Sequence, residues 1–193
     1  MTDATQAHAD RSNGETLFSL KGVSFCVGGT EILPELDLDL EAGRMIGIIG
    51  PNGSGKSSLV KLLARQHAPS TGSISFLGQS RADYSNRELA CRLAYMPQFT
   101  PSAEGMTVAE LVELGRFPWH GALGRTDGTD AAKVTDAIGR TGLERFSGRL
   151  VDSLSGGERQ RCWLAMMLAQ DAKCLLLDEP TSALDLAHQA EML

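Results

Sequence analysis

Apolar and polar positions alternate in two consecutive segments near the start of the chain. In residues 17–27 and 32–40, apolar side chains recur at about every second position, and this period is typical of strands with one buried face. Gly28 and Gly29 separate the two segments and indicate a turn. The pattern therefore predicts two antiparallel strands at the start of the fold.

Two later segments are continuously apolar instead of alternating. Residues 44–50 end in a glycine, and residues 173–177 end just before two acidic residues. Such runs predict strands that are buried on both faces of a parallel sheet. Two shorter strands are predicted at 73–78 and 92–97.

Helical periodicity fills most of the remaining chain and predicts an α/β fold. Strands at both ends with a mainly helical insert between them favour a core with a helical subdomain. We expect a disordered tail over 1–14, a core formed by 15–86 and 171–193, and a helical subdomain over 87–170. The predicted helices cover 56–65, 86–91, 107–117, 130–148 and 155–170, and a last helix begins at 183.

Composition narrows the classes of function. The chain has 193 residues and a formal net charge of -6, whereas a protein that binds nucleic acid through its phosphates needs an excess of Lys and Arg. No nucleic-acid partner is therefore expected.

No apolar run approaches the ~20 residues of a membrane-spanning helix, and residues 1–16 lack the apolar centre of a secretory signal. The four scattered cysteines predict buried free thiols in a soluble, cytoplasmic protein.

A glycine-rich loop connects the strand predicted at 44–50 to the helix that follows. Its sequence fits the phosphate-binding pattern GxxxxGK[ST]. Glycines let successive backbone N–H groups curve around phosphate oxygens, and the start of the helix adds partial positive charge. Lys56 supplies a positive charge for the β and γ phosphates, and the Ser57 hydroxyl can ligate Mg²⁺. The candidate nucleotide-binding residues are Gly50, Pro51, Asn52, Gly53, Ser54, Gly55, Lys56, Ser57 and Ser58.

Two acidic residues, Asp178 and Glu179, follow the second continuous apolar strand. Ligands of open α/β sheets bind outside the carboxyl ends of the strands, so both acids should face the same crevice as the phosphate loop. Asp178 is a candidate Mg²⁺ ligand, and Glu179 is a candidate general base that polarises an attacking water. An isolated acidic pair could equally be a solvated turn, but the phosphate loop upstream favours catalysis.

A third motif, Leu-Ser-Gly-Gly-Glu-Arg-Gln-Arg, occupies residues 154–161. Ser155 and Glu158 fit a capping box at the start of a helix. A capping box does not require Gly156 and Gly157, however. Ser-Gly-Gly at a helix N-terminus offers a second anion site, formed by free N–H groups and the helix dipole.

With this motif the chain closely resembles the ABC ATPases, from about residue 17 to its end. The resemblance implies a P-loop NTPase (RecA-like) core, Mg-ATP as ligand and ATP hydrolysis as activity. It also implies a head-to-tail homodimer that sandwiches two ATP molecules, in which residues 155–157 of one subunit close over the γ-phosphate held by the other. Gln98 would sense Mg²⁺ and the attacking water, and Asp185 would make contacts across the dimer.

The segment between Gln98 and residue 154 resembles one group of transporters. Gly115-Arg116 followed by Pro118 is similar to ATPases that power importers of siderophores, haem and cobalamin. Residues 118–125 and 182–189 look like the iron(III)-hydroxamate (ferrichrome-type) siderophore import ATPase. The resemblance implies an integral membrane permease docked on the helical subdomain at the cytoplasmic face of the bacterial inner membrane, and indirectly a periplasmic substrate-binding protein. The alternatives are a haem or cobalamin importer ATPase, a soluble ABC-type ATPase and a binding-only remnant.

Two features depart from the family pattern. Val27 stands where many members stack an aromatic side chain on adenine, so no adenine-stacking residue is assigned. The family also carries a switch histidine on a strand that follows the one at 173–177, and His188 lies too early to be that residue. That strand is expected between the strands at 44–50 and 173–177. We therefore expect a chain that is incomplete at its C-terminus, with hydrolysis belonging to the complete chain.

Overall fold

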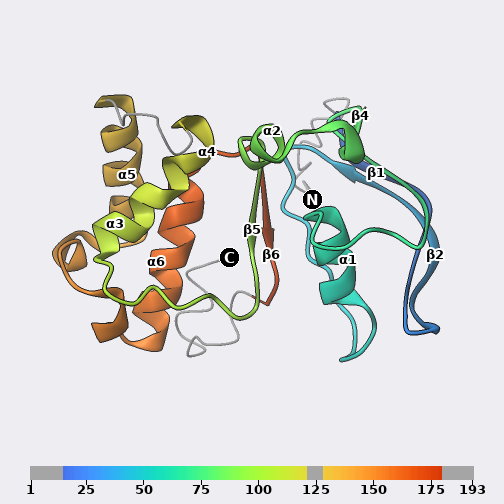
Figure 1. The fold of residues 1–193 in the computed structure, drawn as a ribbon, viewed down its shortest axis with the longest axis horizontal. Coiled ribbons are helices and arrows are strands. Elements are labelled where there is room, and N and C mark those ends of the chain that lie inside the picture. Colours follow the sequence, from blue (N-terminus) through green and yellow to red (C-terminus); the bar gives the residue numbers. More distant parts are fainter. Residues whose placement is uncertain (1–14, 121–127, 180–193) are drawn as a thin grey trace, which may run out of the picture. The chain divides into compact units, whose positions relative to one another are not determined.

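A computed structural model of the chain describes residues 15–120 and 128–179 (Figure 1). The described residues form two compact units, one made of 15–58 and 68–83 and the other of 59–67, 84–120 and 128–179. The division into a core and a helical subdomain at 86/87 and 170/171 stays a prediction. The tail at 1–14 and the helix expected from 183 lie outside the described residues.

The first unit contains an antiparallel sheet in the order β2-β1-β3-β4. β1 pairs with β2 in antiparallel orientation, which confirms the predicted strand pair, and Gly28 and Gly29 adopt positive φ angles at the turn between them. Phe18 of β1 pairs with Phe76 of β3, and their ring centroids lie 4.7 Å apart in the buried core. The elements are β1 (Thr16–Val27), β2 (Thr30–Glu41), β3 (Thr71–Phe76), β4 (Gln79–Ser80) and the 3-10 helix η1 (Arg81–Asp83).

The strand predicted at 44–50 is absent, and this prediction is wrong. These residues form no helix or strand, and Met45 and Ile49 are 80% and 96% exposed. An apolar run becomes a buried strand only where other strands accept and donate its backbone hydrogen bonds. Among the described residues no strand pairs with this segment.

The second unit combines a short parallel strand pair with a group of packed helices (Figure 1). Side chains of α3, α5 and α6 share one apolar core that includes Val108, Leu111, Ala137 and Cys162. The elements are α2 (Asn86–Ala90), β5 (Leu93–Met96), α3 (Val108–Glu113), η2 (Leu114–Arg116), α4 (Phe117–His120), α5 (Gly128–Arg140), η3 (Glu144–Phe146), η4 (Val151–Ser153), α6 (Gly156–Ala169) and β6 (Cys174–Leu177). Helix α1 (Lys56–Leu63) begins in the first unit and continues into the second.

Several boundaries differ from those predicted. The helix expected over 130–148 ends at Arg140, because Gly142 takes a positive φ and Leu143 N–H donates to the Ile138 carbonyl, a hydrogen-bond pattern that terminates helices. Strand β6 is only partly buried, with Leu175 39% exposed, so burial on both faces was a wrong prediction.

The cysteines follow the prediction in part. All four are free thiols, and burial raises the pKa of Cys162 and of Cys174 to about 11. Cys26 is exposed and Cys91 is half-buried, so burial is correct for only two of them. Cys26 lies near the end of β1, where the strand reaches solvent.

A buried ion pair between Arg116 and Asp130, with His120 beside it, joins the segment around α4 to α5 and α6. The Asp130 carboxylate lies 2.8 Å from Arg116 Nε and 2.6 Å from His120 Nε2. Arg116 also donates to the Ala169 carbonyl, and the Trp119 indole donates to the Gln170 carbonyl, at 2.8 and 2.7 Å. The carbonyls at the C-terminal end of α6 therefore accept hydrogen bonds from Arg116 and Trp119.

Candidate nucleotide site

The phosphate loop is shaped by close packing against β2. Gly55 has a φ of +85°, and a Cβ there would lie 2.8 Å from Leu33 Cδ1 and 3.0 Å from the Ile32 carbonyl oxygen. Both the backbone angle and the lack of space favour glycine at this position. Lys56 Nζ folds back and donates to the carbonyls of Gly50 and Pro51, each at 2.8 Å. The backbone of the loop therefore surrounds the ammonium group of Lys56.

Helix α1 begins immediately after this loop. Lys56, Ser57 and Ser58 form its first turn, which contains no acidic side chain. The N–H groups of a first helical turn have no acceptor within the helix, and the helix dipole places partial positive charge there. The loop, Lys56 and the start of α1 together form an environment suited to phosphate oxygens.

Asp178 lies at the carboxyl end of the parallel strand pair. Its N–H donates to the Met96 carbonyl at 3.0 Å, which extends the ladder between β5 and β6 by one step. The residue is 4% exposed, and its Oδ2 atom has no hydrogen-bond partner within 15–120 and 128–179. A buried carboxylate oxygen without a donor is costly. A divalent cation would satisfy it, so Asp178 fits the predicted Mg²⁺ ligand.

Tyr95, which no motif of the sequence singles out, is a neighbour of this carboxylate. Burial raises the pKa of Tyr95, and the negative charge of Asp178 raises it further. Tyr95 pairs with Leu176 in the ladder between β5 and β6. Only the register of these two strands brings Tyr95 close to Asp178, and that register cannot be read from either segment alone.

Glu179 and Gln98 are in direct contact at the same strand ends. Gln98 Nε2 donates to Glu179 Oε2 at 2.5 Å, and both side chains are exposed. Glu179 has a φ of +52°, a left-handed conformation that costs a non-glycine residue about 1–2 kcal/mol. Both residues were predicted as catalytic candidates, but the contact between them was not.

The capping box predicted at Ser155 is present at the start of α6. Ser155 N–H and its hydroxyl both lie 2.8 Å from Glu158 Oε2, and the Ser155 hydroxyl accepts from Glu158 N–H. These bonds, led by the backbone N–H, lower the pKa of Glu158. A Cβ at Gly156 would meet no atom of the described residues within 4 Å, so this helix start is open to an approaching group.

The candidate site residues are divided between the two units. The phosphate loop belongs to the first unit, whereas Gln98, Asp178, Glu179 and the motif at 154–161 belong to the second. The structure shows a contact between Gln98 and Glu179. That the other groups come together at one site stays a prediction. Asp185 lies outside the described residues.

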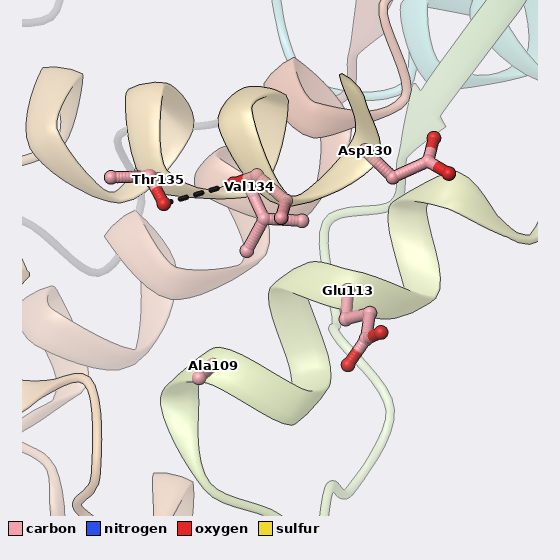
Figure 2. Close-up of a pocket in the computed structure, with 6 residues that line it drawn as sticks. Ala109, Glu113, Asp130, Val134 and Thr135 are labelled. Carbon is pink, nitrogen blue, oxygen red and sulfur yellow. Dashed lines mark hydrogen bonds between the residues drawn. The ribbon is translucent and has the colours of Figure 1, made fainter. Parts of the chain in front are cut away.

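A hollow of about 220 Å³ lies between α3 and α5 (Figure 2). Asp130, one of its lining residues, already forms an ion pair with Arg116. None of the predicted nucleotide-site residues contributes to it, so we do not assign nucleotide binding to this hollow. Its lining residues are Ala109, Glu113, Asp130, Ala131, Val134 and Thr135.

Comparison with known proteins decides the family. The model of the ABC transporter family matches residues 33–182, which include the phosphate loop, the motif at 154–161 and the acidic pair. The chain belongs to the ABC transporter family. Nucleotide binding follows from this membership. None of the described helices of this ABC transporter chain has the length and hydrophobicity to span a membrane.

Similar proteins include ATP-binding proteins of transport and import systems. The achromobactin transport ATP-binding protein of Dickeya dadantii (strain 3937) is 45% identical over 84% of this chain and 60% of its own length. The iron(3+)-hydroxamate import ATP-binding protein of Bacillus subtilis (strain 168) is 40% identical, over 86% and 62%. This ABC transporter chain therefore spans about three fifths of the length of these relatives.

A solved structure supports the fold class. The structure of cbiO1 from Clostridium perfringens, part of the ABC transporter complex cbiONQ, is 25% identical and covers 92% of this chain and 71% of that one, with a TM-score of 0.77. The chain thus has the P-loop NTPase fold of ABC ATPases, with an antiparallel N-terminal sheet and a parallel strand pair.

Proposed function

We propose that this chain is the ATP-binding and ATP-hydrolysing subunit of an ABC importer. The observation that carries the proposal is the phosphate loop closed around Lys56 at an acid-free helix start. This arrangement provides backbone donors and one fixed positive charge for a triphosphate. The buried Asp178 oxygen without a donor among the described residues supports a cation at the second half of the site.

In this proposal each residue has a distinct task. Lys56 binds the β and γ phosphates, and Glu179 accepts a proton from the attacking water. Ser57, Asp178 and Gln98 would hold Mg²⁺ through oxygen atoms, the ligands that this cation prefers. When bound, Mg²⁺ neutralises charge on the phosphates.

The working form would be a head-to-tail homodimer. Ser155, Gly156 and Gly157 of one subunit would close over the γ-phosphate bound by the other, and the open space at Gly156 supports such an approach. Asp185 would make contacts across the dimer. The dimer would bind two integral membrane permease subunits at the cytoplasmic face of the bacterial inner membrane, and a periplasmic protein would deliver the substrate.

We infer that the cargo is an iron(III)-siderophore complex of the hydroxamate class. The relative named for iron(3+)-hydroxamate import supports this class. The subunit itself would not contact the cargo, so the test is uptake of labelled ferric hydroxamate by cells that contain or lack the chain. Loss of haem uptake with unchanged ferric hydroxamate uptake would favour the haem importer instead.

Nucleotide binding is tested by thermal unfolding with and without Mg-ATP. A ligand that binds only the folded state stabilises it by RT ln(1 + [L]/Kd), about 2.7 kcal/mol at a hundredfold excess over Kd. We expect the unfolding temperature to rise with Mg-ATP, and Lys56→Ala to lose most of that rise. Absence of any rise for the unchanged chain, or an equal rise in both proteins, would contradict the assignment of Lys56.

A further inference from the structure

The contact between Gln98 and Glu179 follows from the register of β5 and β6. Met96 is paired with Leu177 in this parallel ladder, and Asp178 N–H extends it by donating to the Met96 carbonyl. Gln98 and Glu179 each lie two residues beyond the last pair. Equal steps along two parallel strands keep their side chains adjacent, although 81 positions separate them in sequence.

The chemistry of the two side chains fixes the direction of the contact. An ionised carboxylate has only acceptors, so the amide nitrogen of Gln98 must face it. One carboxylate oxygen, Glu179 Oε2, is thereby engaged at 2.5 Å. The amide oxygen of Gln98 and Oε1 of Glu179 take no part in this bond.

We propose that Gln98 is a positioning residue that orients the carboxylate of Glu179. The inference rests on the proposed function, in which Glu179 is the general base. A base that is itself held by a third group loses less orientation at the moment of proton transfer. With Gln98 Nε2 on Oε2, Glu179 Oε1 would be left for the attacking water, and the amide oxygen of Gln98 could help to hold the cation when it is bound.

This role differs from action through the cation alone. If Gln98 only supplies an oxygen ligand, Gln98→Glu retains that ligand and retains turnover. If Gln98 orients Glu179, the same change removes the N–H donor and sets two carboxylates side by side, which repel each other. The one substitution therefore separates the two roles.

The contact itself is tested without nucleotide, by thermal unfolding of four proteins. These are the unchanged chain, Gln98→Glu, Glu179→Gln and the double variant Gln98→Glu/Glu179→Gln, which restores an amide facing a carboxylate. We expect Gln98→Glu to lower the unfolding temperature and the double variant to recover it. Additive effects of the two changes would overturn the contact, while leaving nucleotide binding at the phosphate loop untouched.

The orienting role is tested by steady-state ATP hydrolysis. We expect Gln98→Glu to lower kcat by about tenfold or more, with KM for Mg-ATP little changed and no recovery at higher Mg²⁺. Retained kcat, or recovery on raising Mg²⁺, would overturn the inference. If Mg-ATP does not raise the unfolding temperature of the unchanged chain, or raises that of Lys56→Ala equally, the proposed function is overturned, and the inference with it.

Discussion

At the scale of single residues, two consecutive acids have opposite surroundings. Asp178 is buried, and one of its oxygens has no donor among the described residues, whereas Glu179 is exposed and bonded to Gln98. Neighbouring carboxylates in different environments suit different tasks. The buried acid fits a cation, and the exposed one remains accessible to water.

Glu179→Gln should leave Mg-ATP binding intact and reduce turnover by about 10²–10⁴-fold, because the amide cannot take up the proton of the attacking water. Thermal stabilisation by Mg-ATP measures binding, and phosphate release measures turnover. Glu104→Gln, a change of the same kind at another exposed residue, is the control and should alter neither. Turnover close to normal in Glu179→Gln would remove Glu179 from the role of base.

At the scale of elements, the best predicted feature is α6. The sequence places this helix at 155–170 and the structure at Gly156–Ala169, with the capping box of Ser155 and Glu158 present. A capping box is encoded within four residues, so local sequence suffices to start the helix. The packing of α6 against η2 could not be predicted from local sequence.

Gly115 of η2 lies directly against the backbone of α6. A Cβ there would collide with the carbonyl oxygen of Met166, and backbone cannot move aside as a side chain can. We expect Gly115→Ala to destabilise the fold by roughly 1–3 kcal/mol in denaturant unfolding. Gly139→Ala in α5, where the nearest atom is 3.8 Å away, is the control and should be neutral or stabilising by up to ~1 kcal/mol. Equal effects would refute the close packing.

The capping box also predicts a response to acid. Hydrogen bonds from Ser155 lower the pKa of Glu158 below its ordinary value of 4.5. A carboxyl with a lowered folded-state pKa contributes stability above the unfolded-state pKa and loses it as the pH falls through the folded-state pKa. Gln also forms a capping box, so Glu158→Gln should fold at neutral pH. Its unfolding temperature should fall less steeply below pH 4.5 than that of the unchanged chain; equal slopes would contradict this.

At the scale of the whole molecule, the proposed site is complete only when two chains meet. The phosphate loop and the open start of α6 would then act on the same triphosphate from different subunits. The acidic pair lies at strand ends, as expected for ligands of open α/β sheets. Dimerisation should therefore depend on nucleotide.

Glu179→Gln should slow hydrolysis enough to trap that dimer. We expect its mass in light scattering to double when Mg-ATP is added, and to remain that of a monomer when Lys56→Ala is also present. The rise in mass should increase with protein concentration, as mass action requires. A monomer at every concentration with saturating Mg-ATP would contradict the head-to-tail dimer.

Features that are encoded locally could be predicted from the amino-acid sequence alone. Alternation predicted β1 and β2, and the capping box predicted the start of α6. The prediction of a phosphate site at the glycine-rich loop before Lys56 likewise rests on local sequence. In each of these cases, the residues that carry the pattern lie within one short segment of the chain.

The tertiary structure alone decided which segments meet. The apolar run at 44–50 reads as a buried strand but has no strand partner among the described residues. Conversely, Gln98 meets Glu179 and Tyr95 approaches Asp178 only because β5 and β6 pair in one register. Hydrogen-bond partners and burial come from residues distant in sequence, and a pattern within one segment carries no information about them.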